Sequence, residues 1–318
     1  MPKLREITTG LDFPEGPIAM DDGSVIVVEI AGGNLKRVKP DGRHQVLARC
    51  GGGPNGAAFG PDGTVYVCNN GGFDYQRLDV GPLPIAGFPG GELHVPGLQA
   101  PDYIGGRIQR VDIHTGRVED LYVECDGRPL RAPNDIVFDD FGGFWFTDHG
   151  QTRERDRDRT GVFYARADGS LIEEVIFPLD GPNGIGLSPG GGLLYVAETY
   201  PTRLWSWPIP SPGTVVQDTT VLPISGQLVV DPPGVHVWDS LAVEADGNIC
   251  LGTLITGCIT VVSPEGEIVE RVSAPDPLTT NICFGGADLR TAYITLSGIG
   301  ALVAADWPRP GLRLNYQQ

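Results

Sequence analysis

Six segments of this chain share one pattern, and this repeat limits the possible folds more than any other feature. Each segment has a polar residue, a strand of small apolar residues, a turn rich in Gly, and a second strand of β-branched and aromatic residues. The six segments are residues 13–30, 53–70, 132–149, 181–199, 237–254 and 279–296. Asp-Gly between two apolar runs is typical of a β-hairpin, because the type I′ turn needs positive φ angles.

Most of the repeats continue into a second hairpin, which predicts four antiparallel strands per unit. The second hairpins turn at residues 40–42, 114–116, 168–169 and 264–266. A four-stranded sheet cannot bury both faces alone, so neighbouring sheets must pack face to face around an axis. We therefore predict an all-β, six-bladed β-propeller, with residues 1–318 as a single domain. A β-sandwich or two β domains would also contain Asp-Gly hairpins, but would not repeat one polar position six times.

The last unit is about one strand short, whereas residues 4–8 precede the first unit without a partner. We expect this N-terminal strand to complete the sixth blade. The ring would then close and hide a strand edge that could otherwise pair with another chain.

Composition narrows the possible partners and compartments. The formal net charge of −17 disfavours nucleic acid and anionic membrane surfaces, since both require basic patches. The chain has no apolar run long enough to span a membrane and no signal-peptide core, so we expect a cytoplasmic protein. The six cysteines lack a Cys-x-x-Cys pair, and we expect them to be buried and reduced. A small-molecule substrate and a monomer or small homo-oligomer fit these features.

The repeated polar position is the main functional signal. The innermost strand of every propeller blade lines the axis, so equivalent positions form a ring. The six residues are Glu15, Asn55, Asn134, Asn183, Asp239 and Asn281. Such oxygen donors suit one divalent metal, with Ca²⁺ favoured and Mg²⁺, Mn²⁺, Fe²⁺ and Zn²⁺ as alternatives. An Asn after Pro is also an ordinary turn residue, and Asn55 and Asn281 fit that role, or the holding of a water, best.

Several of these openings also resemble a known family. The motifs are Pro14-Glu15-Gly16-Pro17, Pro133-Asn134-Asp135, Pro182-Asn183-Gly184, Trp238-Asp239-Ser240-Leu241 and residues 280–286. Over about residues 10–307, the chain is similar to the senescence-marker-protein/gluconolactonase/luciferin-regenerating-enzyme family. The resemblance implies a six-bladed propeller, lactonase or esterase activity, and a metal held by Glu15, Asn134, Asn183 and Asp239. It also implies a substrate contact at Arg131, displaced by about one residue from the position of the corresponding Arg in sugar lactonases.

Our working hypothesis for the chemistry is Lewis-acid hydrolysis of a lactone. The metal would polarise the carbonyl, while Asp239 or a nearby histidine would help a water attack, without a Ser or Cys nucleophile. His149 ends one inner hairpin and His236 lies three residues before Asp239, and either could move a proton, although a packed or surface histidine is the more ordinary interpretation of each. The candidate catalytic residues are Asp239, Asn134, His149, His236 and Arg131. A metal-dependent lyase or isomerase, or a propeller that only binds a ligand, remains an alternative.

The longest loop, residues 71–106, is predicted to lie on the metal face. It is rich in aromatic residues, and we interpret it as a lid-like insertion, with an oligomer contact or a solvent-exposed flap as the alternative. The predicted substrate-binding residues are Asn55, Asn281, Tyr103 and Phe88. A second loop, residues 151–160, carries alternating charges that are typical of a solvated surface.

Overall fold

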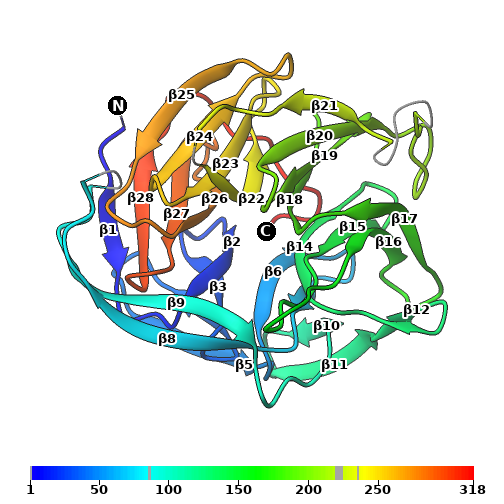
Figure 1. Ribbon diagram of the computed structural model, residues 1–318, viewed down its shortest axis with the longest axis horizontal. Coiled ribbons are helices and arrows are strands. Elements are labelled where there is room, and N and C mark those ends of the chain that lie inside the picture. Colours follow the sequence, from blue (N-terminus) through cyan, green and yellow to red (C-terminus); the bar gives the residue numbers. More distant parts are fainter. Residues whose placement is uncertain (1, 85–86, 219–224, 235) are drawn as a thin grey trace.

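A computed structural model of the protein describes residues 2–84, 87–218, 225–234 and 236–318. The described chain forms six four-stranded antiparallel sheets, which are arranged around a common axis (Figure 1). The predicted six-bladed β-propeller is therefore confirmed. Within the described residues, no helix is long and apolar enough to cross a membrane.

Each blade runs from the axis outward, mostly in chain order. Blade one contains β2 (Pro14–Ala19), β3 (Val25–Glu29), β4 (Asn34–Val38) and β5 (His44–Arg49). Blade two contains β6 (Pro54–Phe59), β7 (Val65–Asn69), β10 (Arg107–Asp112) and β11 (Arg117–Tyr122). Blade three contains β14 (Pro133–Phe138), β15 (Gly143–Asp148), β16 (Thr160–Arg166) and β17 (Ile172–Leu179).

The other three blades follow the same plan. Blade four contains β18 (Pro182–Leu187), β19 (Leu193–Glu198), β20 (Arg203–Pro208) and β21 (Gln227–Val230). Blade five contains β22 (Val237–Val243), β23 (Ile249–Leu254), β24 (Cys258–Val262) and β25 (Ile268–Ser273). Blade six contains β26 (Thr279–Gly285), β27 (Thr291–Leu296), β28 (Ala301–Asp306) and β1 (Arg5–Thr8). A short pair, β12 (Glu124–Cys125) and β13 (Arg128–Pro129), links blades two and three.

The predicted closure of the ring is confirmed, because β1 pairs with β28 on the outside of blade six. Arg5 lies opposite Ala304 and Glu6 lies opposite Val303 in an antiparallel register. The first strand of the chain thus covers the edge of its last sheet, and hydrogen bonds rather than packing alone hold the two ends of the ring together.

The hydrophobic core is divided among the contacts between neighbouring blades. One cluster joins blades three and four through Trp145, Trp205 and Trp207, and equivalent clusters join the other adjacent pairs. Side chains alternate along each strand, so every blade packs against a neighbour on both faces. All six cysteines are buried and free, as predicted.

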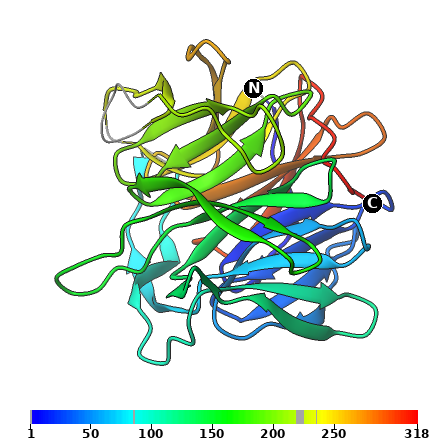
Figure 2. The same cartoon turned by 90° about the vertical axis from the view of Figure 1, so that its right-hand side faces the viewer.

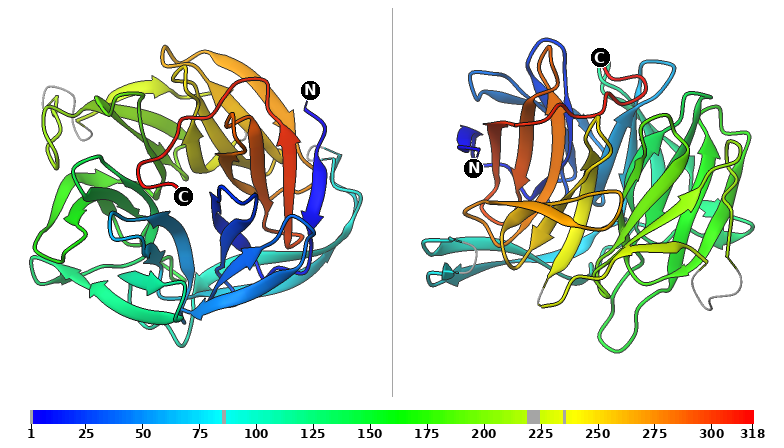
Figure 3. Two further views of the ribbon diagram at one scale, coloured as in Figure 1. Left: turned by 180° about the vertical axis from the view of Figure 1, so that it is seen from behind. Right: turned by 90° about the horizontal axis from the view of Figure 1, so that it is seen from above.

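Different segments of the chain lie at the two ends of the axial tunnel. The segment between β7 and β10 forms a long hairpin of β8 (Phe73–Val80) and β9 (Gly91–Gln99), which projects from one end of the propeller (Figure 2). The C-terminal segment crosses the axis at the opposite end (Figure 3). Asn315 donates to the Phe138 carbonyl and Gln317 to that of Phe284, both at 3.0 Å, which fixes this segment beneath the tunnel.

Candidate metal centre

The six predicted polar residues all lie near the start of the innermost strands. These strands, β2, β6, β14, β18, β22 and β26, contact one another in sequence around the axis (Figure 1). Glu15 and the four asparagines are buried, whereas Asp239 is partly exposed. The structure thus arranges the six side chains at one level of the tunnel.

A β-bulge accompanies this position in every blade. The pairing of the innermost strand with its neighbour shifts between Glu15 and Ile18 in blade one and between Pro133 and Ile136 in blade three. The remaining four blades shift at the equivalent place. Because a bulge bends its strand and redirects a side chain, these irregularities belong to the ring and are not defects.

Glycines after the ring residues allow adjacent blades to meet closely. A Cβ on Gly16 would overlap the carbonyl oxygen of Asn55, and one on Gly56 would overlap that of Asn134. A Cβ on Gly184 would lie 2.8 Å from the carbonyl oxygen of Asp239. The small residue that follows the polar one is therefore required by the approach of the next blade.

Hydroxyl groups on or directly after the second strands fix the backbone at the ring positions. Thr147 donates to the carbonyl of Asn183 at 2.6 Å, and Ser297 donates to that of Pro14 at 2.6 Å. Each bond joins one blade to the backbone beside the next ring residue. The ring is consequently preorganised by its supporting strands.

Only one of the two carboxyl oxygens of Glu15 accepts hydrogen bonds from the described residues. Its Oε2 accepts hydrogen bonds from the Gly16 amide and from Asn281 Nδ2, both at 2.6 Å. Its Oε1 is buried and meets no donor within the described residues. Burial raises the pKa of Glu15, while the bonds from Asn281 and Gly16 lower it. Asn281 is engaged in positioning Glu15.

Asn183 and Asp239 form the opposite part of the ring. Asn183 Nδ2 donates to Thr199 Oγ1 at 3.1 Å, and its Oδ1 accepts from Ser240 at 3.5 Å. Burial, followed by the charge of Glu15, raises the pKa of Asp239 well above its ordinary value, and a bond from Asn183 lowers it. Two carboxylates that feel each other's charge thus face a shared space.

The donor set of this ring fits a hard divalent cation. Asn134 Oδ1, like Glu15 Oε1, is buried without a hydrogen-bond donor in the part of the chain that is described. Buried polar atoms are ordinarily paired, and one cation between them would satisfy both. No three His, Cys, Asp or Glu side chains among the described residues group into a metal cluster, so amide oxygens would have to complete the coordination.

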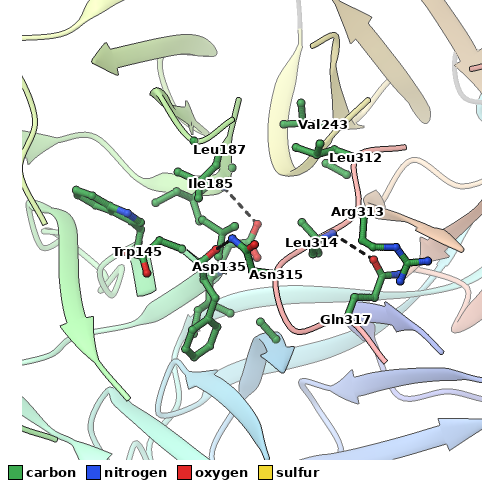
Figure 4. Close-up of a pocket in the computed structure, with 18 of the residues that line it drawn as sticks. Asp135, Trp145, Ile185, Leu187, Val243, Leu312, Arg313, Leu314, Asn315 and Gln317 are labelled. Atoms are coloured by element: carbon green, nitrogen blue, oxygen red, sulfur yellow. Dashed lines mark hydrogen bonds between the residues drawn. The ribbon is translucent and has the colours of Figure 1, made fainter. Parts of the chain in front are cut away.

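Asp135 is a buried carboxyl group at the axis that the sequence prediction missed. Its two oxygens accept bonds from the amides of Ile136 at 2.9 Å and Ile185 at 3.4 Å (Figure 4). Burial, and then the charge of Glu15, raise its pKa to about 8. It lines a cavity of about 470 Å³ that continues toward the C-terminal segment. The signal in the sequence was an acid where three other repeats have Gly.

The two histidines lie at the rim rather than in the ring. His149 packs 5.4 Å from Tyr200, and burial lowers its pKa to about 4. Burial also lowers the pKa of His236. Nδ1 of each ring is buried and accepts no hydrogen bond from the described residues. Neither histidine is bonded to a ring acid among the described contacts.

The predicted substrate contacts occupy different environments. The Tyr103 hydroxyl donates to the Arg131 carbonyl at 2.5 Å, so it fastens the insertion to blade three. The Arg131 side chain is exposed, and Asn55 makes no side-chain hydrogen bond among the described residues. Phe88 is buried with Leu93 in a small cluster between the hairpin and Ile299 of blade six. Residues 85–86 of the predicted lid lie outside the described residues.

The structure also locates a serine motif and a charged loop. The chain contains one Gly-x-Ser-x-Gly match, residues 186–190, but the structure places it in the turn between β18 and β19, where Ser188 Oγ accepts from the Leu193 amide at 2.9 Å. A nucleophilic serine would need a strand-to-helix turn there. In the charged loop, Arg153 forms a partly buried ion pair with Asp158 at 2.8 Å, so this part of the loop is more ordered than the predicted solvated surface.

Comparisons with known proteins match the chain to one family model and to proteins that share its propeller fold. A family model described as the SMP-30/Gluconolactonase/LRE-like region matches residues 13–298. A gluconolactonase of Zymomonas mobilis is 24% identical over 318 residues, which span 92% of this chain and 79% of the relative.

Two solved structures share the fold across nearly the whole chain. A gluconolactonase from Xanthomonas campestris has a TM-score of 0.73 at 20% identity and covers 96% of this chain and 90% of its own. Regucalcin from Agrobacterium tumefaciens, a calcium-binding protein, has a TM-score of 0.70 at 18% identity, with 96% and 95% covered. At these identities the likeness establishes a common propeller architecture.

Proposed function

Because the chain belongs to the SMP-30/gluconolactonase/LRE-like family, we propose that it is a lactonase with one divalent cation at the mouth of its axial tunnel. The gluconolactonase relative supports a lactone as the substrate class. One observation carries the proposal: in a ring of acids and amides, Glu15 Oε1 and Asn134 Oδ1 are buried without donors among the described residues.

Calcium is the cation that this ring suits best. The proposed ligands are Glu15, Asn134, Asn183 and Asp239. Ca²⁺ takes six to eight oxygen ligands in flexible geometry, which a mixed set of carboxylates, amides and waters can supply. The calcium-binding regucalcin structure, which shares the fold, supports the same choice. When bound, the cation would supply Lewis acidity toward the carbonyl oxygen of the lactone.

Asp239 is our candidate for the base, because it is the ring acid that is partly exposed, whereas Glu15 is buried. It would take a proton from the water whose oxygen bonds to the carbonyl carbon. The ring carbon–oxygen bond then breaks, and the proton passes to the leaving alkoxide oxygen, which gives a hydroxy acid. Asn281 holds Glu15 and Thr199 holds Asn183, so both act as positioning residues. Arg131 and Asn55 stay predicted substrate contacts.

A lactone panel with removal of the metal tests this proposal. We expect hydrolysis that EDTA abolishes and Ca²⁺ restores, and we expect Asp239→Asn to lower kcat by at least about 100-fold. Asp306→Asn, which changes an exposed acid on an outer strand, is the matched control and should keep full activity. Activity that persists in EDTA would rule out the proposed cation.

Isotope labelling separates hydrolysis from isomerisation at the same site. In H₂¹⁸O, a lactonase places one solvent oxygen in the new carboxylate, whereas an isomerase leaves the substrate mass unchanged. Mass spectrometry of the product distinguishes the two results. An unlabelled product of the same mass as the substrate would contradict lactone hydrolysis.

A further inference from the structure

The β8–β9 hairpin reaches along one half of the tunnel mouth. At one point the His94 amide donates to the Gly298 carbonyl of blade six at 2.8 Å. At its end the Gln99 amide donates to the Thr152 carbonyl of blade three at 2.9 Å. Blades six and three face each other across the ring, so β9 is held to opposite blades at its middle and at its end (Figure 1).

A cavity of about 440 Å³ lies between this hairpin and the first two blades. Its lining includes Asp12, Phe73, Tyr75, Arg77, His94 and Ile104. Phe73, Tyr75 and Arg77 alternate along β8 and therefore share one face of the hairpin. That face turns toward the propeller.

The Tyr75 side chain packs between two other aromatic side chains. Its aromatic ring lies 5.0 Å from that of Phe13 and 5.0 Å from that of His94. Phe13 is two residues before Glu15, and His94 Nδ1 is in turn 3.2 Å from Asp12 Oδ1. An aromatic side chain packed on two sides loses little entropy when it binds a ligand.

The Tyr75 side chain lines this cavity next to Phe13, whose chain leads directly into the ring residue Glu15. Its aromatic ring is packed against Phe13 and His94, and its hydroxyl group makes no hydrogen bond with the described residues. Burial, and then the charges of Glu15, Asp239 and Asp12, raise the pKa of Tyr75 well above its ordinary value. The group therefore stays protonated and is a hydrogen-bond donor without a protein acceptor in the described chain.

We propose that Tyr75 is a further substrate-contacting residue, whose hydroxyl group donates a hydrogen bond to the lactone bound at the ring. This inference rests on the proposed lactonase function. A donor at this place stabilises negative charge that develops on a substrate oxygen as the ester opens. The hairpin is thus a wall of the active site and not only a cover.

Tyr75→Phe tests the role because it removes one oxygen atom and keeps the packing with Phe13 and His94. With D-glucono-1,5-lactone and Ca²⁺, we expect kcat to fall about 100-fold, while the calcium Kd and the Tm stay unchanged. Tyr195→Phe is the matched control, since Tyr195 lies in the core between blades four and five. It should keep the wild-type kcat.

Two results would overturn the inference. One is a Tyr75→Phe enzyme whose kcat/KM is within twofold of wild type. The other is a weaker calcium Kd in this variant, because the hydroxyl would then serve the cation ring rather than the substrate.

Binding of D-glucono-δ-lactam, which resists hydrolysis, separates this inference from the proposed function. If the wild type hydrolyses no lactone, the proposed function fails, and lactam affinity then decides the role of Tyr75. A tenfold weaker lactam Kd for Tyr75→Phe supports the contact. Equal affinities, or no binding by the wild type, contradict it.

Discussion

At the scale of single residues, the candidate site is marked by two buried oxygen atoms that have no hydrogen-bond donor among the described residues. Asn281 and Gly16 satisfy one oxygen of Glu15, but the other oxygen and that of Asn134 meet no donor in the described structure. Leaving such groups unpaired costs about 1–3 kcal/mol each. A bound cation would recover this free energy, so the same atoms link stability to metal binding.

His149 supplies a pH-dependent test at this scale. Burial lowers its folded pKa to about 4 from 6.5, so the unfolded chain binds more protons between these values. The free energy of unfolding should therefore fall as the pH drops from about 6.5 to 4, by up to about 3 kcal/mol from this residue. Urea unfolding of wild type and His149→Gln without metal measures the difference. Parallel pH profiles for the two proteins would contradict the burial argument.

At the level of residues, the sequence could predict which side chains meet where a position repeats, but it offered no such guide within the insertion. Glu15, Asn183 and Asp239 could be found because six equivalent positions must meet at an axis. Tyr75 could not, because it reaches the site from an insertion with no counterpart in the other blades. Phe88 stays a predicted substrate contact; the structure buries it in a small apolar cluster with Leu93 and Ile299, which helps a two-stranded extension to be stable.

At the scale of elements, the inner strands are built for close approach. Each has a bulge at the polar position, and three have a glycine directly after it. The sequence showed the glycines as part of the repeat, but the bulges depend on strand pairing and become visible only in the structure. Strand and glycine together decide where the polar side chain points.

Gly56 tests this relation. In Gly56→Ala the new Cβ would overlap the Asn134 carbonyl, so we expect a loss of about 1–3 kcal/mol in the free energy of unfolding and a weaker calcium Kd. Gly192→Ala is the matched control, because no atom lies within 4 Å of its added Cβ and its φ is not in the left-handed region. Its free energy of unfolding and its calcium Kd should match those of the wild type. An unchanged calcium Kd in a folded Gly56→Ala protein would show that blade packing at this position does not control the geometry of the ring.

At the scale of the whole molecule, closure of the propeller brings six polar residues, each ordinary on its own, together at the axis as a candidate site. One Asn after a Pro is an ordinary turn residue. Six sheets that pack on one another around an axis, with β1 completing the last, leave the equivalent residues no direction except inward. The sequence predicted this geometry because repeat and closure are both readable in it. The path of the β8–β9 hairpin along one side of the mouth depends on contacts between distant segments, and it could not be predicted from the sequence.

A crystal structure of the protein with Ca²⁺, with the ion located by anomalous scattering, tests the central claim most directly. We expect one peak inside the ring, about 2.3–2.6 Å from oxygens of Glu15, Asn134, Asn183 and Asp239. A ring that contains only water at saturating Ca²⁺, or a cation bound elsewhere, would contradict it.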